Sequence, residues 1–114
     1  MPQSLAKVYI HLVFSTKYRV NLIDEKIEAE LFPYLATIFR ENDSPSLAIN
    51  AAWNHVHSLF LLSRKVALCD VIEEVKKSSS KWIKTKGAQY RKFYWQNGYG
   101  AFSVSQSGDR KSVV

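Results

Sequence analysis

The sequence is poor in the features that mark membrane-spanning, secreted and metal-cluster proteins. No apolar run approaches the length of a membrane helix, about 18 residues. Residues 1–6 lack the basic and then apolar order of a secretory signal. Cys69 is the single cysteine, which excludes an intramolecular disulfide framework and a cysteine zinc cluster. We therefore expect a cytoplasmic protein with no membrane partner.

Glycine, proline and acidic residues are also scarce. With 4 Gly and 3 Pro in 114 residues, the chain contains no linker, internal repeat or low-complexity stretch, so residues 1–114 predict one domain. Sixteen Lys and Arg stand against ten Asp and Glu, which gives a net charge of +6. This balance favours a polyanionic partner, and nucleic acid is the commonest one.

Hydrophobic periodicity predicts six segments in the order strand, helix, strand, strand, helix, strand. Asp24 is the expected N-cap of the first helix, Pro33 should kink or split that helix, and Gly87 should stop the second one. The expected segments are 7–15, the stretch from Asp24 to the break at 42–45, 46–53, 56–62, 70–86, and the strand after the Asn97-Gly98 turn within 93–105.

This order predicts an α+β, ferredoxin-like β-α-β-β-α-β fold. Its four-stranded antiparallel sheet would carry both helices on one face and leave the other face open. In the first strand Val8, Ile10, Leu12 and Phe14 share one face. We expect Trp82, Phe93 and Phe102 in the core, and residues 107–114 to begin a third helix.

His55-Val56-His57 is the triplet with the clearest chemical meaning. In a strand, side chains at i and i+2 point to the same face, so these two imidazoles could bind one divalent metal and leave positions open for phosphate or water. The alternative is a pair of half-buried strand histidines without a ligand. The third histidine, His11, belongs to another strand, so a closed site of four histidines is impossible within one chain.

Basic side chains gather at two places. Lys77, Lys81 and Lys84 share a stripe of the second helix with Lys76 slightly aside, and Lys17-Tyr18-Arg19 follows the first strand. Either group could neutralise phosphates, although a solvated helix face is the simpler explanation for the stripe. Aromatic residues near the stripe could stack on unpaired bases; these are Tyr90, Phe93, Tyr94, Trp95 and Tyr99.

Four blocks of sequence, in this order along the chain, resemble one protein family. They are F-S-T-K-Y-R at 14–19, W-N-H-V-H at 53–57, V-K-K-S-S-S-K-W-I at 75–83 and W-Q-N-G-Y-G-A-F-S-V-S at 95–105. Together they are similar to the small single-strand DNA transposases of the HUH superfamily, the TnpA-type tyrosine transposases of bacterial insertion sequences.

The resemblance implies a ferredoxin-like homodimer that acts on single-stranded or hairpin DNA. It implies that His55 and His57 bind Mg²⁺ or Mn²⁺, which polarises the phosphate to be cleaved. In the family, a helix after the last strand supplies a tyrosine that forms a 5′-phosphotyrosine, and a further metal ligand one turn later.

The sequence departs from the family pattern in two places. Val113 and Val114 align just before the nucleophilic tyrosine, and none of Tyr90, Tyr94 and Tyr99 matches it. We therefore expect a derivative truncated before the tyrosine helix, which binds DNA and does not form the covalent intermediate. Residue 54 is Asn where many relatives have Asp.

Two other functions stay open on the sequence alone. One is a non-catalytic nucleic-acid-binding module of the RRM kind, although the strands 7–14 and 56–62 contain no RNP motif. The other is a passive dimeric structural protein, which would show no affinity for nucleic acid at low salt.

Overall fold

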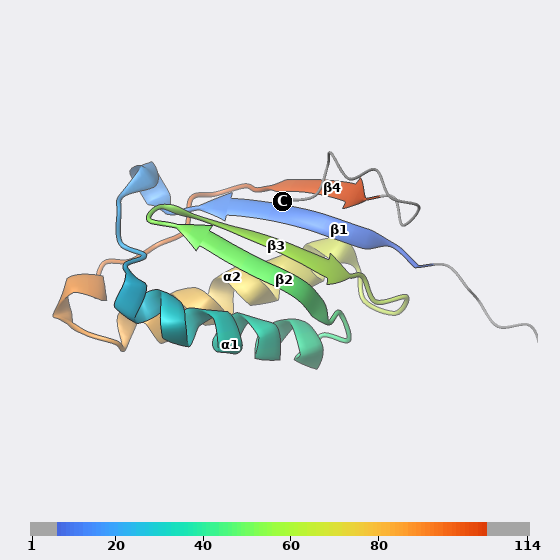
Figure 1. Cartoon of the computed structure of the whole chain (residues 1–114), viewed down its shortest axis with the longest axis horizontal. Helices are drawn as coiled ribbons and strands as arrows, with labels where there is room; N and C mark the ends of the chain where they lie inside the picture. The colour runs from blue at the N-terminus through green and yellow to red at the C-terminus, as the bar shows by residue number, and fades with distance from the viewer. Residues whose placement is uncertain (1–6, 105–114) are drawn as a thin grey trace, which may run out of the picture.

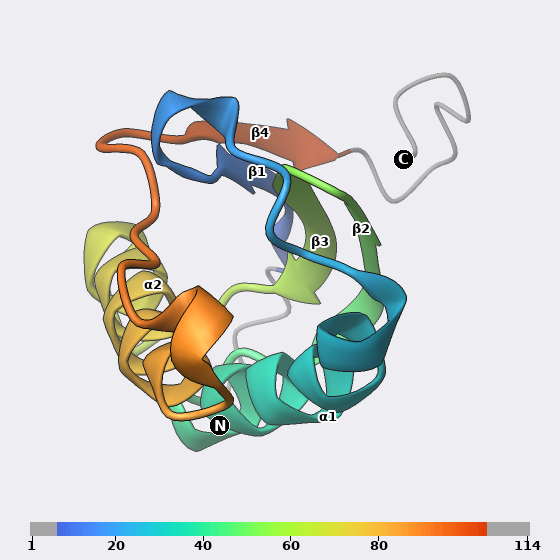
Figure 2. The same ribbon diagram turned by 90° about the vertical axis from the view of Figure 1, so that its left-hand side faces the viewer.

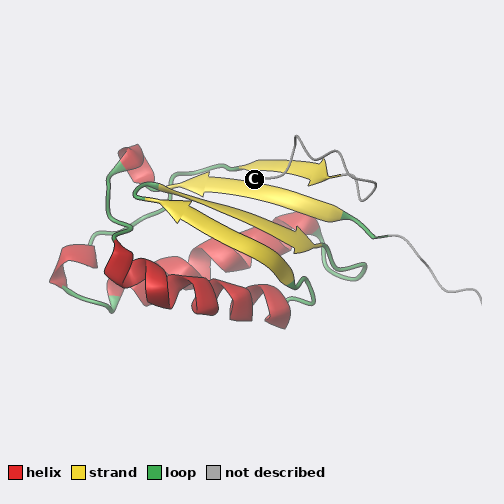
Figure 3. Ribbon diagram, in the orientation of Figure 1, coloured by secondary structure: helices red, strands yellow, loops and turns green. Residues whose placement is uncertain are grey.

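A computed structural model describes residues 7–104, and it confirms the α+β fold predicted from the sequence. Four strands form one sheet, and two long helices pack on the same side of it (Figures 1 and 3). The elements in chain order are β1 (Tyr9–Ser15), the one-turn helix η1 (Lys17–Arg19), α1 (Glu25–Glu41), β2 (Ser46–Ala52), β3 (His55–Leu61), α2 (Leu68–Lys84), the one-turn helix η2 (Ala88–Tyr90) and β4 (Gly100–Val104).

The sheet has the strand order β2-β3-β1-β4, and every neighbouring pair is antiparallel. β1 therefore lies between β3 and β4, with Val13 opposite both His57 and Gly100. Trp53 and Asn54 form the tight turn between β2 and β3. Viewed from the end, the sheet and the two helices form separate layers, with one sheet face left uncovered (Figure 2).

The core fills the space between the sheet and the helices. Strand alternation sends Ile10, Leu12 and Phe14 of β1, and Val56 and Phe60 of β3, toward the helices. Apolar side chains at helical spacing meet them from α1 and α2; these include Leu31, Leu35, Phe39, Val71, Ile72, Val75 and Ile83. The alternate strand positions consequently point to the uncovered face. His55 and His57 of β3 occupy two of these positions.

Helix α1 begins as predicted and runs through its proline. The Asp24 carboxylate accepts a hydrogen bond from the Ile27 N–H and another from the Tyr90 hydroxyl, at 2.9 and 2.7 Å. Both bonds stabilise the charged carboxylate and lower its pKa, the Ile27 bond most. The expectation that Pro33 could split the helix is wrong. Pro33 has no N–H to donate to the Ala29 carbonyl, four residues earlier. Because both residues are exposed, water can donate a hydrogen bond to that carbonyl instead.

Two core predictions need correction, and one prediction cannot be assessed. Phe102 is not in the core, because Ala101 takes the inward position on β4 and turns Phe102, 60% exposed, to the uncovered face. Trp82 is only partly buried and stacks on Tyr34, whereas Phe93 is buried as expected. The third helix predicted for residues 107–114 lies outside the described residues. Within residues 7–104, neither long helix has the length and apolarity needed to cross a membrane.

Candidate metal and nucleic-acid site

His55 and His57 lie together on the uncovered face of β3. Their ring centroids are 4.8 Å apart and their planes are nearly perpendicular. Val56 between them is fully buried against the helices, which fixes the strand so that both imidazoles face outward. Both side chains are partly exposed, so a ligand can reach them from solvent.

Asn54 sets the proton position of His55. The Asn54 amide nitrogen lies 3.5 Å from the Arg19 carbonyl and donates to it, which identifies the other amide atom as the oxygen. That oxygen lies 2.8 Å from His55 Nδ1, and because an amide oxygen can only accept, the contact is a hydrogen bond in the tautomer whose Nδ1 carries the proton. The remaining nitrogen, Nε2, keeps its lone pair and can bind a metal or accept a hydrogen bond.

His11 extends the pair across to β1. Its Nε2 lies 3.2 Å from His57 Nδ1, and the two rings stack with centroids 5.4 Å apart. Burial is the main cause that lowers the pKa of His57, followed by the charges that His55 and His11 would carry, and burial also lowers the pKa of His11. These rings are therefore neutral near pH 7, which is the form that ligates metals. When His57 Nδ1 donates to His11, His57 Nε2 is free as a ligand.

The two histidines form one wall of a hollow of about 500 Å³, which we call the histidine pocket. Arg19, an exposed residue, also lines this pocket. Tyr18 and Arg19 both have left-handed backbone conformations, with φ of 58° and 56°. Such conformations are uncommon for residues with side chains and tend to occur at functional sites. The opposite wall is formed by residues 96–100 and Phe102.

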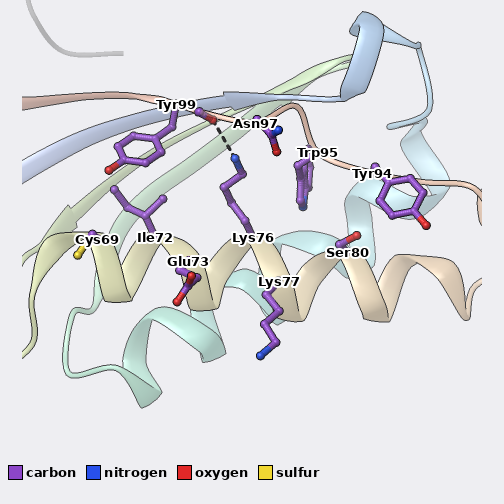
Figure 4. A pocket seen from close by; sticks show the side chains of 11 residues that line it. Cys69, Ile72, Glu73, Lys76, Lys77, Ser80, Tyr94, Trp95, Asn97 and Tyr99 are labelled. Atoms are coloured by element: carbon purple, nitrogen blue, oxygen red, sulfur yellow. Dashed lines mark hydrogen bonds between the residues drawn. The ribbon is translucent and has the colours of Figure 1, made fainter.

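Residues 94–99, which we call the 94–99 segment, are tied on two sides. On the β1 side, the Gln96 N–H donates to the Ser15 carbonyl at 2.7 Å. On the helix side, Trp95 Nε1 donates to Ser79 Oγ at 2.9 Å. The Lys76 ammonium donates to the carbonyl of Gln96 at 2.8 Å. It also donates to the carbonyl of Gly98 at 2.8 Å (Figure 4). Burial lowers the pKa of Lys76. Its charge is thus already satisfied by backbone oxygens.

The other predicted basic residues differ in how free they are. Lys77 and Lys81 are exposed on α2. Lys84 donates to Ser80 Oγ at 2.7 Å and lies 4.1 Å from the Tyr94 ring centroid, a cation–π contact. Lys17 lies near the rings of Tyr18 and Tyr94, at 5.4 and 5.9 Å, and the Tyr18 side chain is 81% exposed. Of the predicted basic residues, Lys17, Lys76 and Lys84 therefore contact the 94–99 segment.

Comparison with known proteins now decides the family. The sequence model of the family described as "Transposase IS200 like" matches residues 4–114. The chain belongs to the IS200-like transposases. No curated protein sequence matches this IS200-like transposase.

Its fold recurs in solved structures, two of which are described as transposases. One is a protein described as a transposase from Deinococcus radiodurans R1, with 21% identity and a TM-score of 0.81 over 93% of this chain and 85% of that one. The other is a REP-associated tyrosine transposase bound to a REP hairpin, with 13% identity and a TM-score of 0.65 over 92% of this chain and 61% of that one. At these identities the likeness establishes the fold.

The donor set of this IS200-like transposase fits a metal held by two imidazoles. In residues 7–104, no three or more His, Cys, Asp or Glu side chains come together as a metal-binding group. His55 and His57 have Nε2 atoms that can be free, and the pocket beside them has room for phosphate oxygens or water. Imidazole nitrogen is a softer ligand than the oxygens that Mg²⁺ prefers, which leaves Mn²⁺ the better fit of the two.

The sequence interpretation missed Asn54 as an orienting group and His11 as a neighbour of His57. The proximity of His11 to His57 could have been predicted from the strand order. In a β-α-β-β-α-β fold the first and third strands are adjacent, and His11 and His57 both occupy outward positions. The hydrogen bonds of Lys76 to the 94–99 segment could not be predicted, because the sequence around a helical lysine does not show which distant carbonyls its ammonium will contact.

Proposed function

We propose that this IS200-like transposase binds single-stranded or hairpin DNA and holds one of its phosphates at the histidine pocket. The observation that carries this proposal is the meeting of His55, His57 and Arg19 around one hollow on an otherwise uncovered sheet face. A guanidinium is suited to phosphate, and a pair of imidazoles is suited to a divalent metal. The net charge of +6 favours the same partner. The hairpin in the REP-associated relative supports a DNA ligand.

A divalent metal, Mg²⁺ or Mn²⁺, is the proposed cofactor. His55 and His57 would hold it through Nε2, while Asn54 and His11 keep the other ring nitrogens occupied. When bound, the metal would act as a Lewis acid that polarises a phosphate oxygen. Arg19 would hold the phosphate against it, and the uncovered sheet face would admit the unpaired strand.

The metal proposal can be tested with Mn²⁺ alone, through the loss of the free-ion signal in electron paramagnetic resonance. We expect His55→Ala and His57→Ala each to abolish measurable Mn²⁺ binding. Glu73→Gln, a change outside the histidine pocket, should leave binding intact and serves as the matched control. Equal Mn²⁺ binding by all three variants would contradict the two-imidazole site.

DNA binding can be measured separately, by fluorescence anisotropy of a labelled hairpin with single-stranded flanks. We expect affinity to fall steeply between about 50 and 200 mM salt, as contacts to several phosphates require. Binding should also weaken when a chelator replaces Mn²⁺. No measurable affinity at low salt would refute the proposed function and favour a passive structural protein.

We propose that the 114-residue chain binds DNA without forming a phosphotyrosine. Tyr90 is buried and donates its hydroxyl to Asp24, and burial raises its pKa, so it is a poor nucleophile. By the family resemblance described under Sequence analysis, Tyr94 and Tyr99 do not occupy the position of the family's tyrosine. The test is nicking of a labelled hairpin with Mn²⁺. Cleavage by this chain would overturn the proposal, and fusion to the tyrosine helix of a relative should produce cleavage.

A non-catalytic nucleic-acid-binding module is the second candidate. The observation that favours it is the finding of only two metal-suited side chains at the histidine pocket within the described residues. Hairpin binding that is indifferent to both a chelator and His57→Ala would decide for this alternative.

For either function a homodimer is our proposal, and light scattering after gel filtration would test it.

A further inference from the structure

A second hollow, which we call the α2 cleft, lies between helix α2 and the 94–99 segment (Figure 4). Its volume of about 480 Å³ is within the range of small-ligand sites, roughly 300–1,000 Å³. Ile72 and Cys69 line it from the first turns of α2, and the Tyr99 ring lies over them. Lys76 crosses the cleft to its carbonyl partners, and Lys77 lies at the same helix turn.

The α2 cleft and the histidine pocket share a wall. Asn97, Gly98 and Tyr99 line both hollows, and Lys76 ties this wall to α2. The Tyr99 side chain is 48% exposed, so its ring is accessible at the boundary. A strand that crosses this wall would therefore place one unit in the cleft and the next unit beside the histidines.

The chemistry of the cleft suits a flat ring attached to an anionic backbone. Tyr99 offers an aromatic face, and Ile72 lies opposite as apolar floor. Asn97 carries an amide that can both donate to and accept from the edge of a base. Lys77 supplies a cation, whereas the Glu73 carboxylate one turn away repels phosphate and restricts the backbone to the Lys77 side.

We propose that the α2 cleft holds one unpaired nucleotide, with its base against Tyr99, next to the phosphate at His55 and His57. This inference rests on the proposed function, because it requires that the protein binds single-stranded DNA. Stacking of a base on an aromatic side chain tolerates all four bases, so the cleft contributes affinity and sets the position of the strand.

The single cysteine of the chain reports on the cleft directly. Cys69 is exposed and lines it, so an occupied cleft should shield the thiol from N-ethylmaleimide. The experiment compares the modification rate with and without a single-stranded oligonucleotide, and anisotropy measures binding independently. At an oligonucleotide concentration of roughly ten times Kd, we expect modification to slow about tenfold.

The control for a general effect of DNA charge on thiols is Cys69→Ser with Ala29→Cys, which moves the thiol to an exposed position on α1. Its rate should not change with DNA. If anisotropy shows binding and the Cys69 rate is unchanged, or slows no more than in the control, the cleft proposal is overturned while the proposed function stands. If anisotropy shows no binding, both are overturned.

A second experiment tests the role of the Tyr99 ring. Loss of one stacked base costs about 1–3 kcal/mol, so Tyr99→Ala should weaken oligonucleotide binding by about 5- to 150-fold. Tyr99→Phe keeps the ring and should restore the affinity. In a series of oligonucleotides with one abasic nucleotide each, one position should show no further loss with Tyr99→Ala. Equal affinities for the alanine and phenylalanine variants, or additive losses at every position, would overturn the assignment.

Discussion

The tie that Lys76 makes to the 94–99 segment leads to a quantitative prediction. Lys76→Met keeps most of the aliphatic stem and removes the ammonium, so the carbonyls of Gln96 and Gly98 lose their charged donor. A hydrogen bond from a charged group contributes roughly 1.5–3 kcal/mol. Gly98 lines the α2 cleft and Gln96 lines the histidine pocket, so water can replace part of each bond. Burial of the ammonium already opposes its charge. We expect the free energy of unfolding to fall by about 1–3 kcal/mol.

Urea denaturation followed by circular dichroism measures this loss, and Lys77→Met is the matched control. Lys77 is the next residue on the same helix and is exposed, so its replacement should change the free energy of unfolding by no more than about 0.5 kcal/mol. The two variants differ only in whether the removed ammonium met carbonyl oxygens. Equal stability of the two would refute the structural role given to Lys76.

The salt dependence of DNA binding separates a tie from a phosphate contact. The logarithm of the binding constant K falls linearly with the logarithm of the salt concentration. Removal of a cation that contacts a phosphate of single-stranded DNA makes this slope less negative by about 0.7. We expect this change for Lys77→Met. Lys76→Met should weaken binding through a displaced wall and keep the slope. A less negative salt slope for Lys76→Met would show that the Lys76 ammonium of the unmodified protein contacts a DNA phosphate.

Three further predictions concern the fold. Asp24→Ala should cost about 1 kcal/mol of stability at pH 7 through loss of the N-cap. Because folding lowers the pKa of Asp24, the stabilisation is present above the carboxyl's ordinary pKa and is lost as the pH falls through the lower folded value, so denaturation curves of wild type and variant should converge in acid. Ser79→Ala leaves the buried Trp95 Nε1 without its acceptor and should cost about 1–3 kcal/mol, measured by urea denaturation; a loss below that of Ser80→Ala would contradict this bond. Phe102→Ser should change stability by no more than about 0.5 kcal/mol, and a loss typical of core residues would restore Phe102 to the core.

The fold was predictable because its local signals agree with one another. Alternation at Ile10, Leu12 and Phe14 identified an inward strand face, and Asp24 marked the start of a helix through a cap that depends only on nearby residues. Phe102 was misplaced for a physical reason: an aromatic residue is usually buried, but a shift of one residue along a strand reverses its face. Ala101 occupies the inward position, and its small side chain gives only a weak hydrophobic signal in the sequence.

The candidate site was predictable only where it is local in sequence. His55 and His57 are two residues apart on one strand, so their common face follows from strand geometry. The contacts of His57 with His11, of Asn54 with Arg19, and of Lys76 with Gly98 join residues between 22 and 46 positions apart. Such pairs depend on how the elements pack, which periodicity and composition do not specify.

The left-handed backbone at Tyr18 and Arg19 has a consequence for how this protein could be stabilised. Glycine adopts that geometry without steric cost, so a selection for heat resistance alone would favour glycine at position 19. The same substitution would remove the side chain of a residue that lines the histidine pocket. Thermal stability and the phosphate contact that we propose for Arg19 thus place opposite demands on this loop, and variants selected for the first should bind DNA more weakly.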